Sequence, residues 1–134
     1  MRLLGENCNP DNLSPLTLAF VGDGVYELFV REYLACLANR SAGELNSRKV
    51  QMVKAAAQAE AFRKISDCLS EKELAIFKRG RNAHPPHSAK NASSADYHAA
   101  TGLEALFGAL YLRGEADLWI IAPDLMPETK IETE

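Results

Sequence analysis

Apolar residues recur at helical spacing along most of the chain, and serines stand where several of these stretches begin. Ser14 followed by Pro15 predicts the start of a first helix, because serine caps free backbone N–H groups and proline fits the first helical position. We expect this helix to end at about Leu37. Apolar side chains cover most of its circumference, which predicts a central, buried helix. These residues are Leu16, Leu18, Phe20, Val21, Val25, Leu28, Phe29, Val30, Leu34 and Leu37.

Two capping boxes, each a serine followed three positions later by a glutamate, predict further helix starts. The first, from Ser41 to Glu44, opens a second helical segment that leads into residues 50–65, where apolar residues recur every three to four positions. The second, from Ser70 to Glu73, opens a short helix that we expect to end by Gly80.

A last, strongly apolar helix is predicted from about Asp96 to Arg113, with Gly114 at the position after its end, where glycine is favoured. Residues 82–94 hold two prolines and several Ser and Asn residues, so we expect them to form a long loop. No stretch of strand length alternates between apolar and polar residues with a period of two. We therefore predict an all-α fold.

The length of 134 residues is that of one domain, so we expect a single domain over residues 1–134. Its helical core should span about residues 14–122, and the acidic end from residue 123 should fray. No stretch approaches the ~20 uncharged apolar residues of a membrane span, and the N-terminus lacks the apolar core of a signal peptide. The 3 cysteines are widely spaced and odd in number, which favours neither disulfides nor zinc. We expect a cytoplasmic protein.

The formal net charge of -3 conceals a basic segment. Residues 115–134 hold six acidic residues and one lysine, so the rest of the chain carries 14 basic and 12 acidic residues. At the predicted helix end near Gly80, guanidinium and backbone N–H groups could bind phosphate oxygens, although cations there also complement the helix dipole. His84 and His87 lack a nearby carboxylate or cysteine and are not expected to bind metal. The candidate residues for binding a nucleic-acid backbone are Lys78, Arg79, Arg81, Asn82 and Lys90.

Gly22, Asp23 and Gly24 lie inside the first predicted helix, where each glycine costs ~1 kcal/mol relative to alanine. A buried carboxylate costs more unless it is paired. A metal ion or a catalytic use of the charge is one compensation, and a helix break that exposes Asp23 as a cap is the other. Glu27 shares the face of Asp23 and is either a second site carboxylate or, as we favour, an ion-pair partner of Arg31.

Glu104 is the only charged residue in the small and apolar stretch from Ala99 to Ala109. Small neighbours allow another helix to approach closely, so Asp23 and Glu104 could face each other and hold Mg²⁺ through carboxylates and water. In the alternative interpretation, Glu104 pairs with Arg113 or Arg31.

These two acidic segments resemble the motifs of the ribonuclease III catalytic domain. Residues 18–27 resemble the family's signature segment, whose core reads Leu-Glu-Phe-Leu-Gly-Asp-Ala, and residues 103–112 resemble its second acidic motif, Phe-Glu-Ala-Leu-Ile-Gly-Ala. Both occur in the family's order within residues 14–113. The absence of a double-stranded-RNA-binding domain, together with residues 78–83, is similar to the small bacterial subgroup called Mini-ribonuclease III.

The resemblance implies a ribonuclease III-like helical bundle in which Asp23 and Glu104 are catalytic and bind Mg²⁺, for which Mn²⁺ can substitute. Further acidic positions of the full-length enzymes fall here on Leu16, Ala19 and Thr101. Fewer carboxylates should mean more coordinating water and weaker metal binding. Thr101 could still hold a coordinated water and, like Glu27 above, is an accessory candidate.

The resemblance also implies a homodimer that cleaves both strands of double-stranded RNA and leaves 5′-phosphate and 3′-hydroxyl ends. The subgroup implies maturation of the large-subunit (23S) ribosomal RNA precursor, and it leaves open whether a ribosomal protein presents this substrate. The alternative is a non-catalytic RNA-binding or ribosome-assembly module of the same fold, and the presence of both acidic residues argues against it. A helical protein-interaction domain is a third interpretation.

Overall fold

The computed structural model describes residues 2–4, 8–83 and 94–114, and every regular element in these ranges is helical. The predicted all-α fold is confirmed. None of the described helices is long and apolar enough to cross a membrane. The loop residues His84, His87 and Lys90 and the acidic end after Gly114 lie outside the described residues. The elements are η1 (Pro10–Asn12), α1 (Pro15–Leu37), α2 (Ala42–Val53), α3 (Ala55–Ile65), η2 (Ser66–Cys68), α4 (Glu71–Asn82) and α5 (Ser94–Arg113).

Serine side chains cap three of the helices, as the sequence predicts. Each hydroxyl accepts a hydrogen bond of 3.1 to 3.2 Å from the backbone N–H three positions later, at Ser14, Ser41 and Ser70. The capping box at Ser70 is complete, because its backbone N–H donates to the Glu73 carboxylate at 2.8 Å. The box predicted at Ser41 is only half formed, since the Glu44 carboxylate binds Arg48 at 3.1 Å instead.

The second predicted helical segment is two helices, because the backbone leaves the helix at Lys54. Lys54 is extended (φ -65°, ψ 156°), ends α2 and begins α3 without a side-chain cap. At this break the carbonyl oxygen of Val53 accepts a hydrogen bond from the side-chain amide of Gln58 at 2.8 Å. No glycine, proline or capping residue marks the break, so the apolar period alone did not indicate it.

α4 continues past Gly80, where we expected it to end, to Asn82. Gly80 serves packing instead, since a Cβ there would lie 2.7 Å from the Cβ of Ala105 and 2.9 Å from the Cα of Gly102 in α5. Gly114 does take the predicted role after α5, with a φ of 66° that suits glycine.

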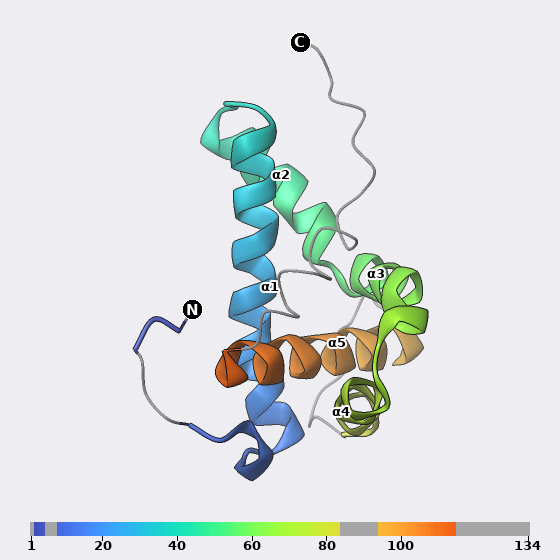
Figure 1. Cartoon of the computed structure of the whole chain (residues 1–134). Helices are drawn as coiled ribbons and strands as arrows, with labels where there is room; N and C mark the ends of the chain where they lie inside the picture. The colour runs from blue at the N-terminus through green and yellow to red at the C-terminus, as the bar shows by residue number, and fades with distance from the viewer. Residues whose placement is uncertain (1, 5–7, 84–93, 115–134) are drawn as a thin grey trace.

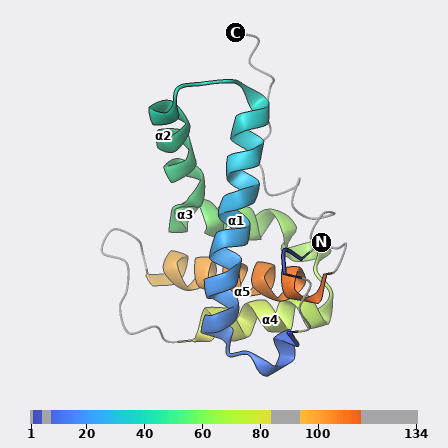
Figure 2. The same ribbon diagram turned by 90° about the vertical axis from the view of Figure 1, so that its left-hand side faces the viewer.

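The central helix is α5, which contacts α1, α3 and α4. Figure 1 shows α5 crossing the long α1 at a steep angle, and Figure 2 shows α4 running beside α5. The first helix was predicted to be central and buried, and it is so only in part, because α5, α2 and α4 cover one side of α1 while Phe20 and Leu28 stay exposed. Four large side chains of α5 are fully buried: Leu103, Leu106, Phe107 and Leu110.

Candidate active site

α1 and α5 cross in direct backbone contact at two glycines. A Cβ on Gly22 would overlap the backbone carbonyl of Glu104, and a Cβ on Gly108 would overlap that of Leu18. Only glycine therefore fits at either position. Gly22 directly precedes Asp23, and Gly108 lies one turn after Glu104, so this crossing brings the two acidic residues together.

The carboxyl groups of Asp23 and Glu104, here called the acidic pair, lie within hydrogen-bonding distance across the crossing. The predicted close approach of their helices is confirmed. α1 runs through Asp23 without interruption, so the alternative of a helix break is wrong. Asp23 is also exposed rather than buried, because it lies on the rim of the crossing, whereas Glu104 is partly buried. The pair can therefore be reached from solvent at Asp23.

Burial and a neighbouring negative charge make it unfavourable to ionise Glu104. Desolvation raises the pKa of Glu104 to about 8, and the hydrogen bond and charge of Asp23 add to the rise. The hydrogen bond that Gln58 donates to Glu104 opposes it. Ionised together, the two carboxylates would repel each other, and a divalent cation between them would remove that repulsion.

The cations that could have neutralised Glu104 bind elsewhere. Arg113 contacts Asp11 at 3.2 Å, and Arg31 contacts Glu27 at 3.5 Å. Lys49 also contacts Glu27, at 3.0 Å, and this hydrogen bond is the main cause of the lowered pKa of Glu27. Glu27 therefore forms the ion pair that we favoured. In residues 8–83 and 94–114, no lysine or arginine forms an ion pair with the acidic pair.

The donor set of this site suits a hydrated metal ion. The described part of the chain holds no cluster of three or more His, Cys, Asp or Glu residues that could bind a metal. A metal at the acidic pair would thus have two carboxylates from this chain and water in its remaining positions. Mg²⁺ prefers oxygen ligands and keeps several waters when proteins bind it, so the acidic pair fits Mg²⁺.

Thr101, the accessory candidate on α5, is buried and donates its hydroxyl hydrogen bond to the backbone carbonyl of Tyr97 at 3.1 Å. No hydrogen bond joins it to the acidic pair in the described structure. Its oxygen keeps the capacity to accept a hydrogen bond from a water, but its proton is already used within α5.

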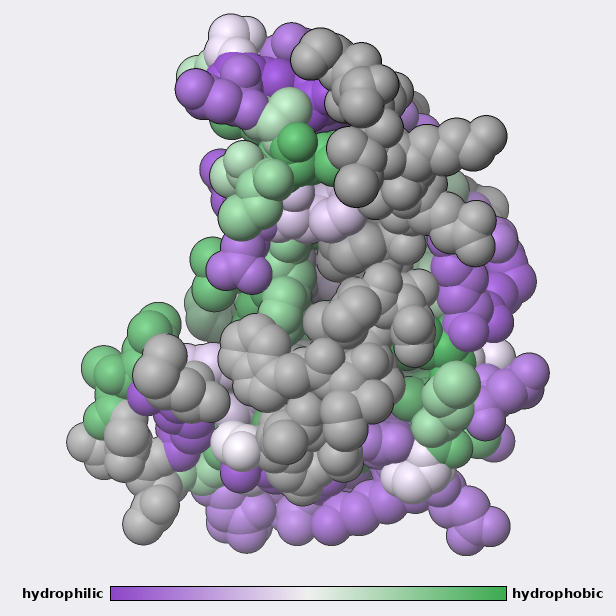
Figure 3. All heavy atoms as spheres, turned by 45° about the horizontal axis from the view of Figure 1, so that its top comes forward, coloured by the Kyte–Doolittle hydropathy of each residue, from purple (hydrophilic) through white to green (hydrophobic). Residues whose placement is uncertain are grey.

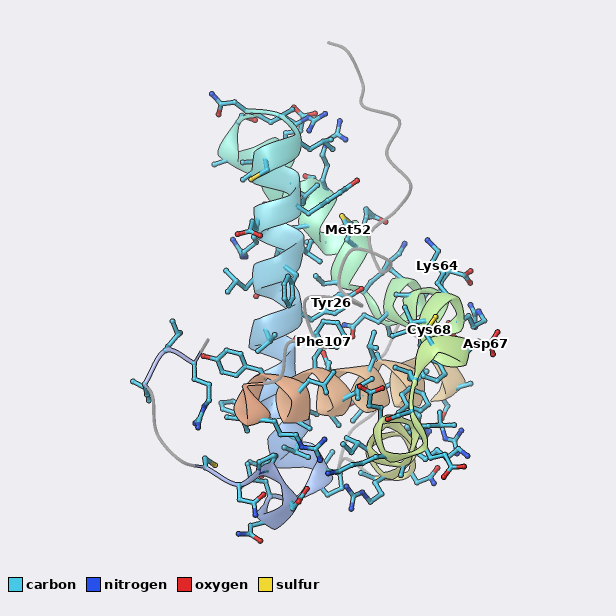
Figure 4. All side chains as sticks on the ribbon, in the orientation of Figure 1. Tyr26, Met52, Lys64, Asp67, Cys68 and Phe107 are labelled. Atoms are coloured by element: carbon cyan, nitrogen blue, oxygen red, sulfur yellow. The ribbon has the colours of Figure 1, made fainter. Side chains whose placement is uncertain are left out.

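Two residues beside Glu104 were absent from the sequence-based candidates. Gln58 of α3 is buried, and its Nε2 donates to Glu104 Oε2 at 3.4 Å. Burial and then the Glu104 charge raise the pKa of Tyr26 to about 12. Figure 4 shows Tyr26 and Phe107 meeting where α1 crosses α5, and their ring centroids are 5.4 Å apart. A glutamine between alanines at residues 55–59 could have indicated a polar contact at Gln58. Nothing in the local sequence indicated that Tyr26 lies beside Glu104.

The last turn of α4, residues 78–82, is here called the basic turn. Lys78, Arg79, Arg81 and Asn82 are all exposed. The Arg81 guanidinium lies over the Phe77 ring, 5.8 Å from its centroid, and its Nε donates to Asn82 Oδ1 at 3.2 Å. Because Gly80 packs against Gly102 and Ala105, the basic turn lies beside the part of α5 that carries Glu104.

Comparison with known proteins agrees with this geometry. Residues 16–115 match the Ribonuclease III domain family. The Mini-ribonuclease 3 of Clostridium tetani is 44% identical over 116 residues, which cover 84% of this chain and 77% of that protein. The Mini-ribonuclease 3 of a Thermoanaerobacter species is 46% identical over 104 residues, covering 78% and 73% respectively.

The fold is similar to a crystal structure of a Fusobacterium nucleatum protein, with a TM-score of 0.75 and 32% identity over 84% of this chain and 90% of that chain. The matched family range includes both members of the acidic pair. Sequence and fold thus lead to the same assignment. The chain belongs to the ribonuclease III domain family and is an endoribonuclease.

Proposed function

We propose that this endoribonuclease cleaves double-stranded RNA with Mg²⁺ held by Asp23 and Glu104, and that Mn²⁺ can substitute. The observation that carries the proposal is the acidic pair itself, held at a backbone contact, open to solvent at Asp23 and without an ion-paired cation among the described residues. The ribonuclease III family acts on double-stranded RNA and generally uses a divalent metal.

Bound Mg²⁺ would lower the pKa of a coordinated water and neutralise charge on the phosphodiester. Asp23 and Glu104 would hold the ion through their carboxylate oxygens, and Glu104 would have to be ionised to do so, so metal affinity is expected to rise with pH. No serine, cysteine or histidine is needed as a nucleophile. Attack of this water on phosphorus, with cleavage of the P–O3′ bond and protonation of the departing 3′ oxygen, would leave a 5′-phosphate and a 3′-hydroxyl.

The basic turn, with Lys90, is proposed to contact the RNA backbone. Replacing both Arg79 and Arg81 by alanine should weaken binding similarly for duplexes of different sequence and lower the salt slope of log K by somewhat less than about one unit per lost contact. Single-turnover kcat should change less than Kd. Filter binding across a salt series measures Kd and the salt slope, and a single-turnover cleavage assay measures kcat.

Lys72→Ala is the matched control, because Lys72 is exposed at the opposite end of α4. We expect it to leave the salt slope unchanged. If the double arginine variant keeps the affinity and salt slope of the unchanged protein, the basic turn does not contact RNA.

The active protein is proposed to be a homodimer that pairs along α1. Leu16, Phe20 and Leu28 recur on one side of this helix and are 37%, 83% and 65% exposed. Figure 3 shows hydrophilic residues over the end where α1 leads into α2 and hydrophobic residues on the flank below it. A two-fold partner would cover this stripe and place two acidic pairs on one duplex.

Light scattering at micromolar concentration should give a mass near twice the 14.7 kDa of one chain. Phe20→Glu should shift the mass toward one chain, because it places a charge in the centre of the apolar stripe. Arg63→Glu, at an exposed position on α3, is the control that should stay dimeric. A single-chain mass for the unchanged protein would contradict the dimer.

We propose the 23S ribosomal RNA precursor as the natural substrate and the cytoplasm as the location, on the basis of the resemblance to the Mini-ribonuclease III subgroup. The test is cleavage of this precursor and of a control duplex in Mg²⁺ with and without EDTA, followed by mapping of the product ends. Adding ribosomal proteins shows whether one of them presents the substrate. Binding without cleavage in Mg²⁺ would contradict the proposed reaction.

A further inference from the structure

Gln58 of α3 is a buried amide held between two acceptors from other parts of the fold. It is 3% exposed, and its Nε2 donates to the Val53 carbonyl at 2.8 Å and to Glu104 Oε2 at 3.4 Å. A carbonyl oxygen can pair only with the N–H end of an amide. The Val53 contact therefore determines which end of Gln58 faces Glu104.

Satisfying the Val53 carbonyl, a purely structural role, explains only one of the two hydrogen bonds that Gln58 Nε2 donates. One N–H satisfies the Val53 carbonyl, which the break between α2 and α3 leaves without its helical partner. The Oε1 atom is buried and has no hydrogen-bond partner in the described structure, which costs stability. The other buried residues of α3, Ala59, Ala61 and Ile65, are apolar, and its Glu60 is exposed and binds Arg63. The contact from Nε2 to Glu104 remains to be explained.

We propose that Gln58 is a positioning residue of the metal site, whose Nε2 holds the Glu104 carboxylate in the orientation that lets it share one divalent cation with Asp23. The inference rests on the proposed metal site. Gln58 is suited to this role because Val53 anchors it and because α3 packs against α5. The amide is also neutral, so it orients Glu104 without competing with the cation as a lysine would.

The test replaces Gln58 by methionine, which has a similar length and no N–H donor. Residues that orient a metal ligand typically contribute 10- to 100-fold to affinity, so we expect Mn²⁺ to bind the RNA-free variant roughly tenfold more weakly by calorimetry. The Mg²⁺ concentration for half-maximal cleavage should rise similarly, and saturating Mg²⁺ should restore most of kcat. Gln51→Met is the matched control, because Gln51 is exposed on α2.

Unchanged Mn²⁺ affinity in folded Gln58→Met would overturn the proposal, and so would the absence of any Mn²⁺ or Mg²⁺ binding by the unchanged protein. If the variant does not fold, the side-chain amide resonances of Gln58 decide the question in the unchanged protein. They should shift when Mg²⁺ binds and should not shift in Glu104→Gln. A protein that binds Mn²⁺ but cleaves no duplex RNA would refute the proposed function, while the Mn²⁺ affinities would still test Gln58.

Discussion

Replacing Glu104 by glutamine, or Asp23 by asparagine, is expected to reduce RNA cleavage by at least about a thousandfold. Each change keeps the shape of the side chain and removes a charge that holds Mg²⁺. Single-turnover cleavage of a duplex at saturating Mg²⁺ measures the effect. Full activity in either variant would contradict the assignment of the acidic pair as the metal site.

Glu27→Gln makes the same chemical change one turn along α1 from Asp23 and serves as the control. Glu27 is engaged by Lys49 and Arg31, so its replacement should cause a much smaller loss. A loss equal to that of Asp23→Asn would give Glu27 a direct role in the site.

The stability of the same Glu104→Gln variant should change in the opposite direction to its activity. The pKa of Glu104 is raised to about 8 from an ordinary value of 4.5, so the folded state keeps a proton that the unfolded chain has already lost. The contribution of Glu104 to stability without metal is therefore greatest below about pH 4.5 and falls as the pH rises toward about 8. Calorimetry should show this decline in Tm for the unchanged protein and a flatter, higher Tm at pH 8 for the variant.

Gly108→Ala is expected to lower the free energy of unfolding by about 3 kcal/mol, because the added Cβ would overlap the Leu18 carbonyl and force α1 away from α5. The same displacement separates the acidic pair, so Mn²⁺ affinity should fall in the protein that remains folded. Urea denaturation measures the first effect and calorimetry the second.

Gly43→Ala is the matched control in α2, because no atom lies within 4 Å of its added Cβ. It should be neutral or stabilise by up to about 1 kcal/mol, since alanine favours the helix. If Gly108→Ala keeps the stability of the unchanged protein, the helices do not meet as closely as described.

Features that depend on a few neighbouring residues could be predicted from the sequence, and those that depend on packing could not. A serine cap acts within three residues, so the helix starts predicted at Ser14, Ser41 and Ser70 were correct. The course of α4 through Gly80 depends on its packing against Gly102 and Ala105 of α5, and no glycine, proline or capping residue marks the break at Lys54. At the site, the small residues around Glu104 indicated a close helix crossing, but only the structure shows that α3 brings an amide to it.

The buried position of Ala19 limits the addition of a third carboxylate to the site. Ala19 lies one turn before Asp23, where the full-length enzymes that this chain resembles carry a glutamate, and here its side chain is part of the core. A glutamate introduced at this position would have to displace packed neighbours or bury a charge. A third carboxylate at position 19 would therefore need compensating substitutions among the core residues packed around it.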